Sequence, residues 1–557
     1  MASLQKRRNK GRDYYYIVES KRINGKPTPI VVAYLGTLDN IITKFTDPAT
    51  ASPDNIIKSY SHGDVFALLQ MAKKIGVVDI MNQCFPPGKR DGLTKSESLL
   101  IMAIHRAISP GSKRSLSDWL SSTTLPDMLS IKADKITSQH CWDQMDGIST
   151  DMLKNAEDAL IEKVLSMYSI DPEKLSLDYT NYFSYIATSN EKSSLAKRGK
   201  NKQKRNDLRQ YSLALITSKE YGLPMYSHVY EGNRVDKTEF PLYVEEVRKR
   251  FKNGDNSGTT FIFDAGNNSK DNFKLLESHG FHYVCAFSLS SCKELYDIPY
   301  EDYETITVND NNRLCKRIKK EIWGKERVCV LYYSAALEKG QITDLNKQID
   351  KSIANLEKLQ ARLENPKSRI AGDYEKIHNA IDKAFSNAYC KRIFDVKAVS
   401  DRKIEWAIDI DEKGVIINKY FGKKLIITDR DDWSTSEILQ SYTEQDSIER
   451  IFKDTKNNEH FSIRPQYHYT DSKVRVHIFC CLLGLTLTGI LKKEFAEKDI
   501  TLTNARLLDE LGEIRQAYIL RKDKPTGRKH KNLLLDKRLE AMTQEQEKLW
   551  EIVNNTM

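Results

Sequence analysis

Residues 259–266 read Thr-Thr-Phe-Ile-Phe-Asp-Ala-Gly, an apolar run typical of a buried strand that ends at Asp264. Residues 175–180, Leu-Ser-Leu-Asp-Tyr-Thr, predict a second strand, which carries Asp178. A third acid, Glu449, lies in a helix-like segment. A single Asp at a strand end is weak evidence of function, because turns and caps use Asp freely. Two carboxylates at strand ends and a third on a helix together predict a site for two divalent cations, since Mg²⁺ prefers oxygen ligands.

The strands that carry the two aspartates belong to a longer mixed α/β pattern. Its order is three strands, a helix, a strand, a helix and a strand, which resembles a ribonuclease H-like core. In that fold the first and fourth strands lie side by side, so Asp178 and Asp264 are expected to meet. The predicted strands are 175–180, 211–217, 224–230, 259–264 and 283–288, and the predicted helices are 237–251 and 271–279.

Composition places the chain among folded proteins with an anionic partner. It has 557 residues, 40% of them hydrophobic and 29% charged, and a formal net charge of +10. That length predicts several domains, and the modest positive charge favours nucleic acid among anionic partners. The nine cysteines form no Cys-x-x-Cys pair. We therefore expect reduced thiols, no zinc site and a cytoplasmic protein.

No membrane anchor is expected. The first residues, Met-Ala-Ser-Leu-Gln-Lys-Arg-Arg, lack the apolar stretch of a signal peptide. The longest apolar run, 476–491, is short for a membrane span and is interrupted by His477. We interpret this run as a buried core helix and His477 as a core residue.

Outside the α/β pattern, changes of periodicity suggest further regions. Alternating strand runs around Asn24-Gly25 predict an N-terminal β-hairpin over 13–36. Apolar residues at steps of three or four over 342–363 predict a long amphipathic helix, either a coiled-coil arm or a packed surface helix. Strand-like runs follow at 403–410, 415–417 and 425–428. The predicted regions are an N-terminal hairpin region (1–57), a helical, DNA-binding or purely structural domain (58–170), the first part of the core (171–292), an insertion (293–430), the second part of the core (431–500) and a helical C-terminal region (501–557).

Residues 442–456 carry a spaced set of polar side chains, Tyr442-x2-Gln445-x3-Glu449-x6-Lys456. This pattern resembles the Y-x2-R-x3-E-x6-K signature of DDE insertion-sequence transposases, whose ribonuclease H-like core is split by an insertion. Gln445 departs from the signature, because it stands where the family has Arg. Other segments similar to the family are Lys-Arg-Gly-Lys at 197–200 with Arg-Gln at 209–210, Gly-Leu-Pro at 222–224, Glu-Gly-Asn at 231–233 with Asp236, and Arg-Pro at 464–465 followed by His477.

The resemblance implies a role for each signature residue. Asp178, Asp264 and Glu449 would bind two Mg²⁺ ions, with Mn²⁺ as a substitute. Tyr442, Gln445 and Lys456 would contact phosphates of the transposon end, although Gln445 lacks the charge of Arg. Because Tyr442, Glu449 and Lys456 are seven residues apart, we expect them on one helix face. Without the family pattern, Lys456 would be read as a solvated helix lysine.

A run of cations follows the first predicted strand. Seven Lys and Arg residues occur between 192 and 205. Such a loop can grip the DNA backbone without reading sequence, or can simply be a solvated hairpin loop. The residues predicted to bind DNA here are Lys197, Arg198, Lys200, Lys204 and Arg205. Trp323 and Trp406 lie in the predicted insertion, where related transposases that cut through a hairpin hold a flipped base; core packing is the more common role of Trp.

These features predict a cut-and-paste DNA transposase. It would bind the terminal inverted repeats of an insertion sequence in double-stranded DNA, hydrolyse a strand at each end and join the 3′-OH to target DNA. The resemblance implies a homodimer on paired ends. Two alternatives remain at this point: an inactive or domesticated transposase-derived DNA-binding protein, and a related ribonuclease H-like nuclease.

Overall fold

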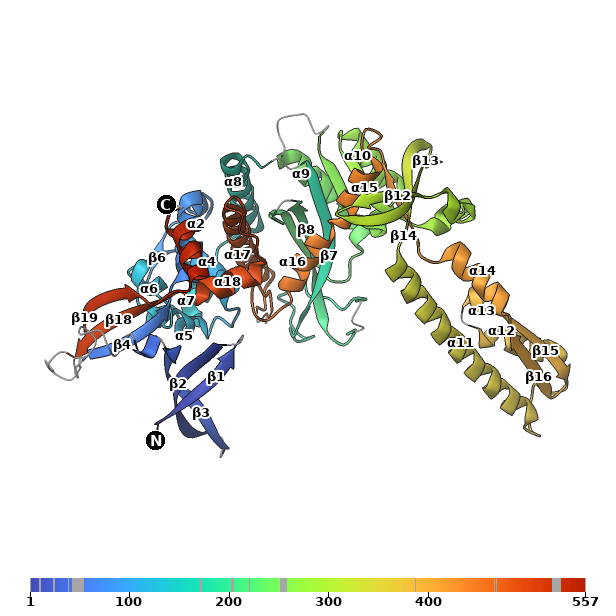
Figure 1. Cartoon of the computed structure of the whole chain (residues 1–557), viewed down its shortest axis with the longest axis horizontal. Helices are drawn as coiled ribbons and strands as arrows, with labels where there is room; N and C mark the ends of the chain where they lie inside the picture. Colours follow the sequence, from blue (N-terminus) through green and yellow to red (C-terminus); the bar gives the residue numbers. More distant parts are fainter. Residues whose placement is uncertain are drawn as a thin grey trace. The chain divides into compact units, whose positions relative to one another are not determined.

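The computed structural model divides the chain into two compact units (Figure 1). Unit 1 consists of Met1–Pro172, Leu177–Arg234 and Ser447–Met557, and unit 2 of Glu173–Ser176 and Val235–Asp446. Unit 2 is therefore an insertion in the sequence of unit 1. The residues described are 2–9, 12–23, 26–38, 40–42, 55–170, 173–201, 205–219, 221–250, 258–385, 387–464, 466, 468–522 and 532–555.

A nine-stranded mixed sheet is the largest element, with strand order β12-β13-β14-β17-β11-β10-β7-β8-β9. Strand β7 contributes its first residues to unit 2 and the remainder to unit 1. As the sequence predicted, the first and fourth strands of the α/β pattern, β7 and β10, are neighbours in this order. The strands are β7 (Lys174–Ser184), β8 (Arg209–Ser218), β9 (Pro224–Glu231), β10 (Thr260–Phe263), β11 (His282–Phe287), β12 (Glu304–Val308), β13 (Asn311–Ile322), β14 (Lys325–Tyr333) and β17 (Lys423–Thr428).

Helices dominate the N-terminal half of unit 1. Helix α4 begins with a capping box, in which Thr94 and Glu97 each accept a hydrogen bond from the other's backbone N–H. Its apolar face packs against α17 and α3. The helices of this part are α2 (Gly63–Ile75), α3 (Val77–Cys84), α4 (Lys95–Ile108), α5 (Leu116–Leu120), α6 (Leu125–Met128), α7 (Ser138–Gln144) and α8 (Thr150–Tyr168), with a short ribbon β5 (Lys89–Arg90) and β6 (Leu93–Thr94).

Helix α17 (Asp471–Ala496) is the core helix of unit 1. By length and apolar composition alone it could cross a membrane, but 83% of its most apolar window is buried inside the protein. This burial is what the sequence predicted for the run 476–491. A Cβ atom at Gly484 would lie 2.7 Å from the carbonyl oxygen of Ala103, so the glycine permits the close approach of α17 to α4.

Two small sheets complete unit 1. Strands β1 (Ala2–Asn9), β2 (Arg12–Ile23) and β3 (Lys26–Gly36) form an antiparallel sheet, and β1 is a strand that the sequence did not predict. The predicted turn at Asn24-Gly25 lies outside the described residues. The second sheet has the order β19-β18-β4 and joins β4 (Asn55–Ser61) to β18 (Arg515–Lys522) and β19 (Asn532–Leu539).

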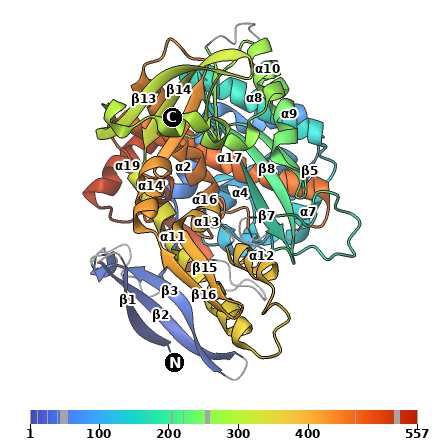
Figure 2. The same cartoon turned by 90° about the vertical axis from the view of Figure 1, so that its right-hand side faces the viewer.

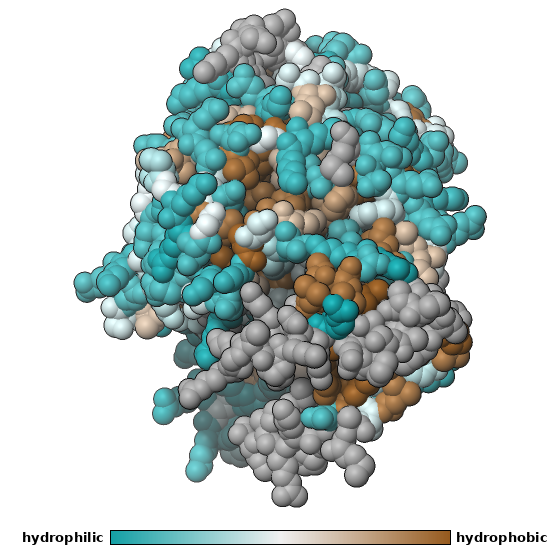
Figure 3. Space-filling model, turned by 90° about the vertical axis from the view of Figure 1, so that its left-hand side faces the viewer, coloured by the Kyte–Doolittle hydropathy of each residue, from teal (hydrophilic) through white to brown (hydrophobic). Residues whose placement is uncertain are grey.

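The prediction of a helical C-terminal region was therefore wrong for β18 and β19. Helices α18 (Asn504–Gly512) and α19 (Gln544–Asn555) flank the two strands. Strand β18 pairs with β4 over 515–521 and 55–61, so its partner lies more than 450 residues earlier in the chain. A strand completed by so distant a partner leaves little local signal. Most of the face in Figure 3 is hydrophilic, and hydrophobic residues gather near its middle.

Unit 2 combines part of the large sheet with a separate subdomain. Strands β12, β13, β14 and β17 extend the sheet within the predicted insertion, and the sequence had not predicted β12 to β14. The other elements on this part are α9 (Asp236–Arg250), α10 (Lys270–Ser278) and α15 (Thr435–Thr443). Within unit 2, α15 contacts β10, β11 and β12.

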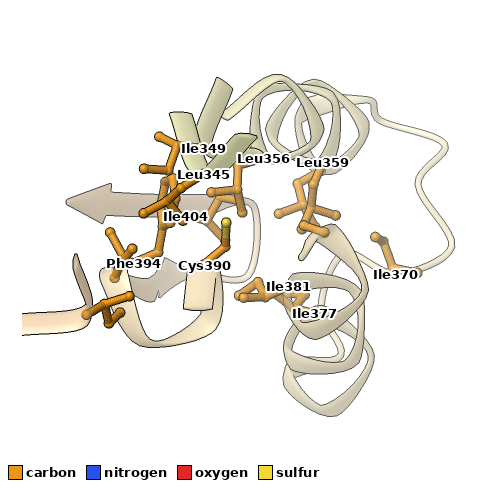
Figure 4. Packing of buried hydrophobic residues seen from close by; sticks show 14 of the residues in the cluster. Leu345, Ile349, Leu356, Leu359, Ile370, Ile377, Ile381, Cys390, Phe394 and Ile404 are labelled. Atoms are coloured by element: carbon orange, nitrogen blue, oxygen red, sulfur yellow. The ribbon is translucent and has the colours of Figure 1, made fainter. Parts of the chain in front are cut away.

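The subdomain is built around α11 (Ala335–Glu364), which follows β14 (Figure 2). One face of α11 packs onto α12 (Tyr374–Ala384), α13 (Ala388–Ile393) and the ribbon of β15 (Phe394–Ser400) and β16 (Lys403–Ile408). Figure 4 shows Leu356 and Leu359 of α11 facing a shared core with Ile377 and Ile381. The predicted amphipathic helix is thus a packed helix.

One strand prediction in this region was wrong. Residues 415–417 lie inside helix α14 (Ile410–Tyr420). Asp409 caps the helix by accepting a hydrogen bond from the N–H of Glu412, and Ile416 packs into the core of the subdomain. A good N-cap and a buried face outweigh the strand preference of a short β-branched run.

Candidate active site

In unit 1, the end of helix α16 (Asp446–Asp454) is bound to strand β7 by polar side chains. The hydroxyl groups of Tyr182 and Thr455 are 2.6 Å apart, and the ammonium group of Lys456 donates a hydrogen bond to Thr180 Oγ1. Lys456 also lies 5.7 Å from the centroid of the Tyr182 ring. These contacts place α16 beside β7 (Figure 1).

Asp178 and Glu449 occupy the two elements that these contacts join. Asp178 precedes Thr180 by two positions on β7, so the two side chains lie on the same face of the strand. Its Oδ1 accepts a hydrogen bond of 2.7 Å from the N–H of Tyr179. Glu449 is an exposed residue of α16. Thr180 was not predicted as a site residue, although its position two residues after Asp178 was a usable signal.

In unit 2, Asp264 follows the last residue of β10 and is exposed. Its Oδ1 accepts a hydrogen bond of 2.8 Å from the hydroxyl of Tyr442, on α15. Burial, and then the negative charge of Asp264, raise the pKa of Tyr442. The tyrosine therefore stays protonated and acts as a donor. Its hydroxyl contacts the predicted metal-binding aspartate, an arrangement the sequence did not suggest.

The prediction that Tyr442, Glu449 and Lys456 share one helix face was wrong. Tyr442 lies near the end of α15, Glu449 is in α16, and Lys456 lies two residues beyond the end of α16. Residues 443–447 include Thr, Asp and Ser, whose side chains compete for backbone hydrogen bonds and favour helix ends. Gln445 lies in the turn between the helices and is only 7% exposed. Its predicted contact with DNA is not tested.

Three of the family-like segments meet around one buried side chain in unit 1. Gln210, which is fully buried, donates a hydrogen bond of 2.7 Å to the carbonyl oxygen of Gly232. A Cβ atom at Gly199 would lie 2.2 Å from that same oxygen, and one at Gly232 would lie 2.1 Å from the carbonyl oxygen of Gln210. Both positions therefore require glycine. This packing fixes the start of the basic loop against β8.

The cations of the basic loop are mainly solvated. Arg198, Lys200 and Arg205 are exposed, and Arg205 pairs with Asp207 at 2.8 Å. Lys197 is partly buried, and its backbone pairs with Gln210 in both directions. Lys204, another predicted DNA ligand, lies outside the described residues, as does Pro465 of the Arg-Pro segment.

The two predicted flipping tryptophans have structural contacts. Trp323 lies at the turn between β13 and β14 with φ of 54° and is 38% exposed. Its ring makes edge contacts with Phe273 and Phe287, at centroid distances of 5.2 and 5.4 Å. Trp406 packs against the core of the α11 subdomain. Neither contact tests a role in base flipping.

The predicted metal ligands are divided between the units, with Asp178 and Glu449 in unit 1 and Asp264 in unit 2. Over the described residues, no group of three or more His, Cys, Asp or Glu side chains forms a ready metal site. The convergence of the three carboxylates therefore stays a prediction.

All nine cysteines are free thiols, as expected. His477 is buried and its Nε2 lies 2.9 Å from the carbonyl oxygen of Ile463, as expected of a core residue.

Comparisons with known proteins add the identity of the domain. No curated protein matches the sequence. The cryo-EM structure of a piggyBac transposase synaptic complex with hairpin DNA is similar at 8% identity, over 81% of this chain and 76% of that chain, with a TM-score of 0.36. A pre-cleavage Mos1 transpososome shares 10% identity over 36% of this chain and 60% of that chain, with a TM-score of 0.15. TM-scores this low do not establish a common fold.

Family models give the stronger result. Residues 3–62 match the N-terminal domain of IS1634 family transposases. Residues 186–487, more than half of the chain, match the transposase DDE domain. Asp264, Tyr442, Glu449 and Lys456 lie inside that match, and Asp178 lies just before it. The chain therefore belongs to the DDE transposases of insertion sequences, enzymes that cleave DNA strands and transfer them.

Proposed function

We propose that this transposase moves its element by cut and paste: it binds the terminal inverted repeats, hydrolyses a strand at each end and joins the 3′-OH to target DNA. The observation that supports this most is the match over 186–487, which contains Tyr442, Glu449 and Lys456 in the family spacing. A homodimer on paired ends belongs to the same proposal.

The catalytic core is proposed to be ribonuclease H-like. The support is the strand order β11-β10-β7-β8-β9, in which the first strand of the pattern is central and the fourth is its neighbour. Asp178 lies in the middle of β7, not at its end as the sequence predicted, and Asp264 follows the last residue of the neighbouring strand β10. The two carboxylates are proposed to share one metal site, completed by Glu449.

The donor set fits two Mg²⁺ ions, or Mn²⁺ as a substitute. All three side chains offer hard oxygen ligands. Asp264 and Glu449 are exposed, and neither forms an ion pair with a residue in the described ranges. The ions, when bound, would supply Lewis-acid activation of the attacking oxygen and stabilisation of the leaving oxygen.

The chain's own residues would prepare these ligands. Tyr442, by donating to Oδ1 of Asp264, fixes the orientation of that carboxylate and leaves Oδ2 for another partner. Lys456 carries its positive charge on the same face of β7 as Asp178, where it would attract a DNA phosphate. Lys197, Arg198, Lys200 and Arg205 would add contacts to the DNA backbone.

The decisive experiment replaces each carboxylate with its amide, as Asp178→Asn, Asp264→Asn and Glu449→Gln. Each variant should lose Mg²⁺-dependent cleavage of end DNA by about 10³-fold or more, since a metal site supplies several kcal/mol of transition-state stabilisation. Binding to end DNA, measured by gel shift, should persist, because other surfaces recognise the ends.

Matched controls are Asp271→Asn and Glu459→Gln, both at exposed acids outside the proposed site. They should cleave as the wild type does. Near-normal cleavage by any of the three site variants would refute that residue's assignment. A wild-type protein that binds ends without cleaving them would instead identify an inactive DNA-binding derivative, and cleavage without joining would identify a nuclease.

A further inference from the structure

Unit 1 contains a polar cavity that the proposed chemistry does not use. Its volume is about 470 Å³, within the range of small-ligand sites. The loop after α4, the start of α7 and the segment leading into α17 surround it. The lining residues that matter here are Lys113, Arg114, Trp142, His468, Tyr469 and His477.

Lys113 is the unusual member of this lining. Its side chain belongs to the cavity wall, yet the residue is only 8% exposed. Among the described residues, nothing forms a hydrogen bond or ion pair with its ammonium group. Burial lowers the pKa of Lys113, as expected of a cation without a counter-ion. A buried charge of this kind is costly unless a partner compensates it.

The surroundings add positive charge without an acid to balance it. Arg106 is fully buried, and its guanidinium donates to the backbone carbonyl oxygens of Gly111 at 2.7 Å and Arg464 at 2.8 Å, with no acidic partner among the described residues. No carboxylate lines the described wall of the cavity. Lys473, which lies 4.5 Å from the Trp142 ring centroid, is already paired with Asp146 at 3.0 Å. The missing partner of Lys113 should therefore be an anion.

The histidines of the cavity also have unused hydrogen-bonding capacity. The Nδ1 atoms of His468 and His477 are buried without a partner in the described structure. Burial lowers the pKa of His468 to about 3, and the positive charges of Lys113 and Lys473 act in the same direction. His105, whose Nδ1 is also unpartnered, is held neutral in the same way. The uncompensated charge thus resides on the lysine and the arginines.

Aromatic rings form the other part of the lining. Trp142 and Tyr469 are nearly parallel, with an interplanar angle of 24° and a centroid distance of 6.3 Å. Tyr469 is 51% exposed, so an aromatic face is available to solvent. His468 lies against Trp142 at 5.3 Å. Cations beside exposed aromatic faces are the combination that binds single-stranded nucleic acid, because bases stack and phosphates pair.

We propose that this cavity binds one unpaired nucleotide of single-stranded DNA, with its phosphate at Lys113 and Arg114 and its base against Trp142 and Tyr469. Duplex DNA is disfavoured because its bases are already stacked and its backbone would have to reach a lysine that is almost wholly buried. The proposal rests on the proposed function only in taking DNA as the macromolecule. It concerns residues outside the carboxylate site.

The test measures binding of a fluorescein-labelled oligothymidylate by the full chain, using fluorescence anisotropy. Lys113→Met removes the charge at nearly constant length and should weaken binding by about 10-fold or more, the effect of losing a charge-assisted hydrogen bond. Trp142→Ala should weaken it by about 10-fold through lost stacking. The matched control, Lys163→Met, removes an exposed lysine of α8 and should change binding less than about 2-fold.

Competitors distinguish the source of the phosphate. Unlabelled oligothymidylate and thymidine 5′-monophosphate should displace the probe, and Trp142→Ala should weaken both. Displacement by inorganic phosphate alone would identify a free-anion site and overturn the proposal. Unchanged oligothymidylate binding by a folded Lys113→Met protein would also overturn it. Either failure would leave cleavage of duplex ends by the wild type intact, so it would not count against the transposase assignment.

Discussion

Two basic regions of unit 1 carry similar charges in opposite surroundings. In the described part of the loop at 192–205, cations such as Arg198 and Lys200 are exposed to solvent. Lys113 in the cavity wall is almost wholly buried, and so is Arg106. A solvated charge costs little free energy and can accept different partners. A buried charge raises the free energy of the folded state unless a specific partner compensates it. The comparison shows that the density of cations in a sequence does not locate the site where charge is most consequential.

The largest expected difference between the two regions is in how stability responds to a fall in pH. The folded pKa of His468 is about 3, well below its value in an unfolded chain. The stability from keeping this residue neutral is therefore present above pH 6.5 and is lost as the pH falls towards 3. By pH 5 the loss from His468 alone should reach about 2 kcal/mol.

Urea denaturation at pH 7.5 and pH 5 would measure this loss in the wild type and in His468→Gln. The variant should lose less stability between the two pH values. The loop at 192–205 contains no histidine, so it contributes no such term. Equal pH dependence of the two proteins would show that His468 does not resist protonation.

Removal of a single charge should change the free energy of unfolding by different amounts in the two regions. Lys113→Met should raise the free energy of unfolding at pH 7 by about 1–3 kcal/mol, since it removes a buried cation without a described partner. Lys200→Met in the loop should change it by less than about 0.5 kcal/mol. Both values come from urea denaturation at pH 7.

The effect of Lys113→Met on stability should also depend on pH in the alkaline range. The pKa of Lys113 is lowered in the folded state, so its charge destabilises the protein below that pKa, and the cost disappears as the pH approaches 10.5. The stability gained by Lys113→Met should therefore shrink at high pH. A destabilised Lys113→Met protein would mean that the ammonium group has a stabilising partner.

The smallest expected effect concerns the loop and duplex DNA. Lys200→Ala should lower the slope of log affinity against log salt concentration by about 0.9, the value for one lost phosphate contact. Thermal stability should be unchanged, because Lys200 is exposed. Affinity across a salt series measures the slope, and Lys163→Ala serves as the control. An unchanged slope would identify the loop as a solvated connection.

Much of the fold could be read from local patterns. The apolar run before Asp264 gave β10, and the steps of three and four gave α11, since both elements bury a face that periodicity reveals. The strand prediction at 415–417 was wrong because the N-cap at Asp409 starts a helix there. Strand β18 was not predicted because its partner, β4, lies in a distant part of the sequence.

The candidate site was predictable in its residue types but not in its contacts. The spacing of Tyr442, Glu449 and Lys456 matched a family pattern, yet the turn at Gln445 separates Tyr442 from the other two. Equal spacing on a helix could not reveal that Tyr442 donates to Asp264. No pattern in the sequence singled out Lys113. Its burial depends on segments around residues 111 and 468, which no local pattern connects.

The pairing of β4 with β18 has a consequence for synthesis of the chain. A ribosome releases β4 early, but its partner strand emerges only after residue 515, when nearly the whole protein has been made. Unit 2, encoded between the segments of unit 1, is finished much sooner and can fold as a domain while synthesis continues. Unit 1 must wait with an unpaired strand and with α4 uncovered by α17. A truncated product that ends before α17 would thus contain a complete unit 2 and an incomplete unit 1.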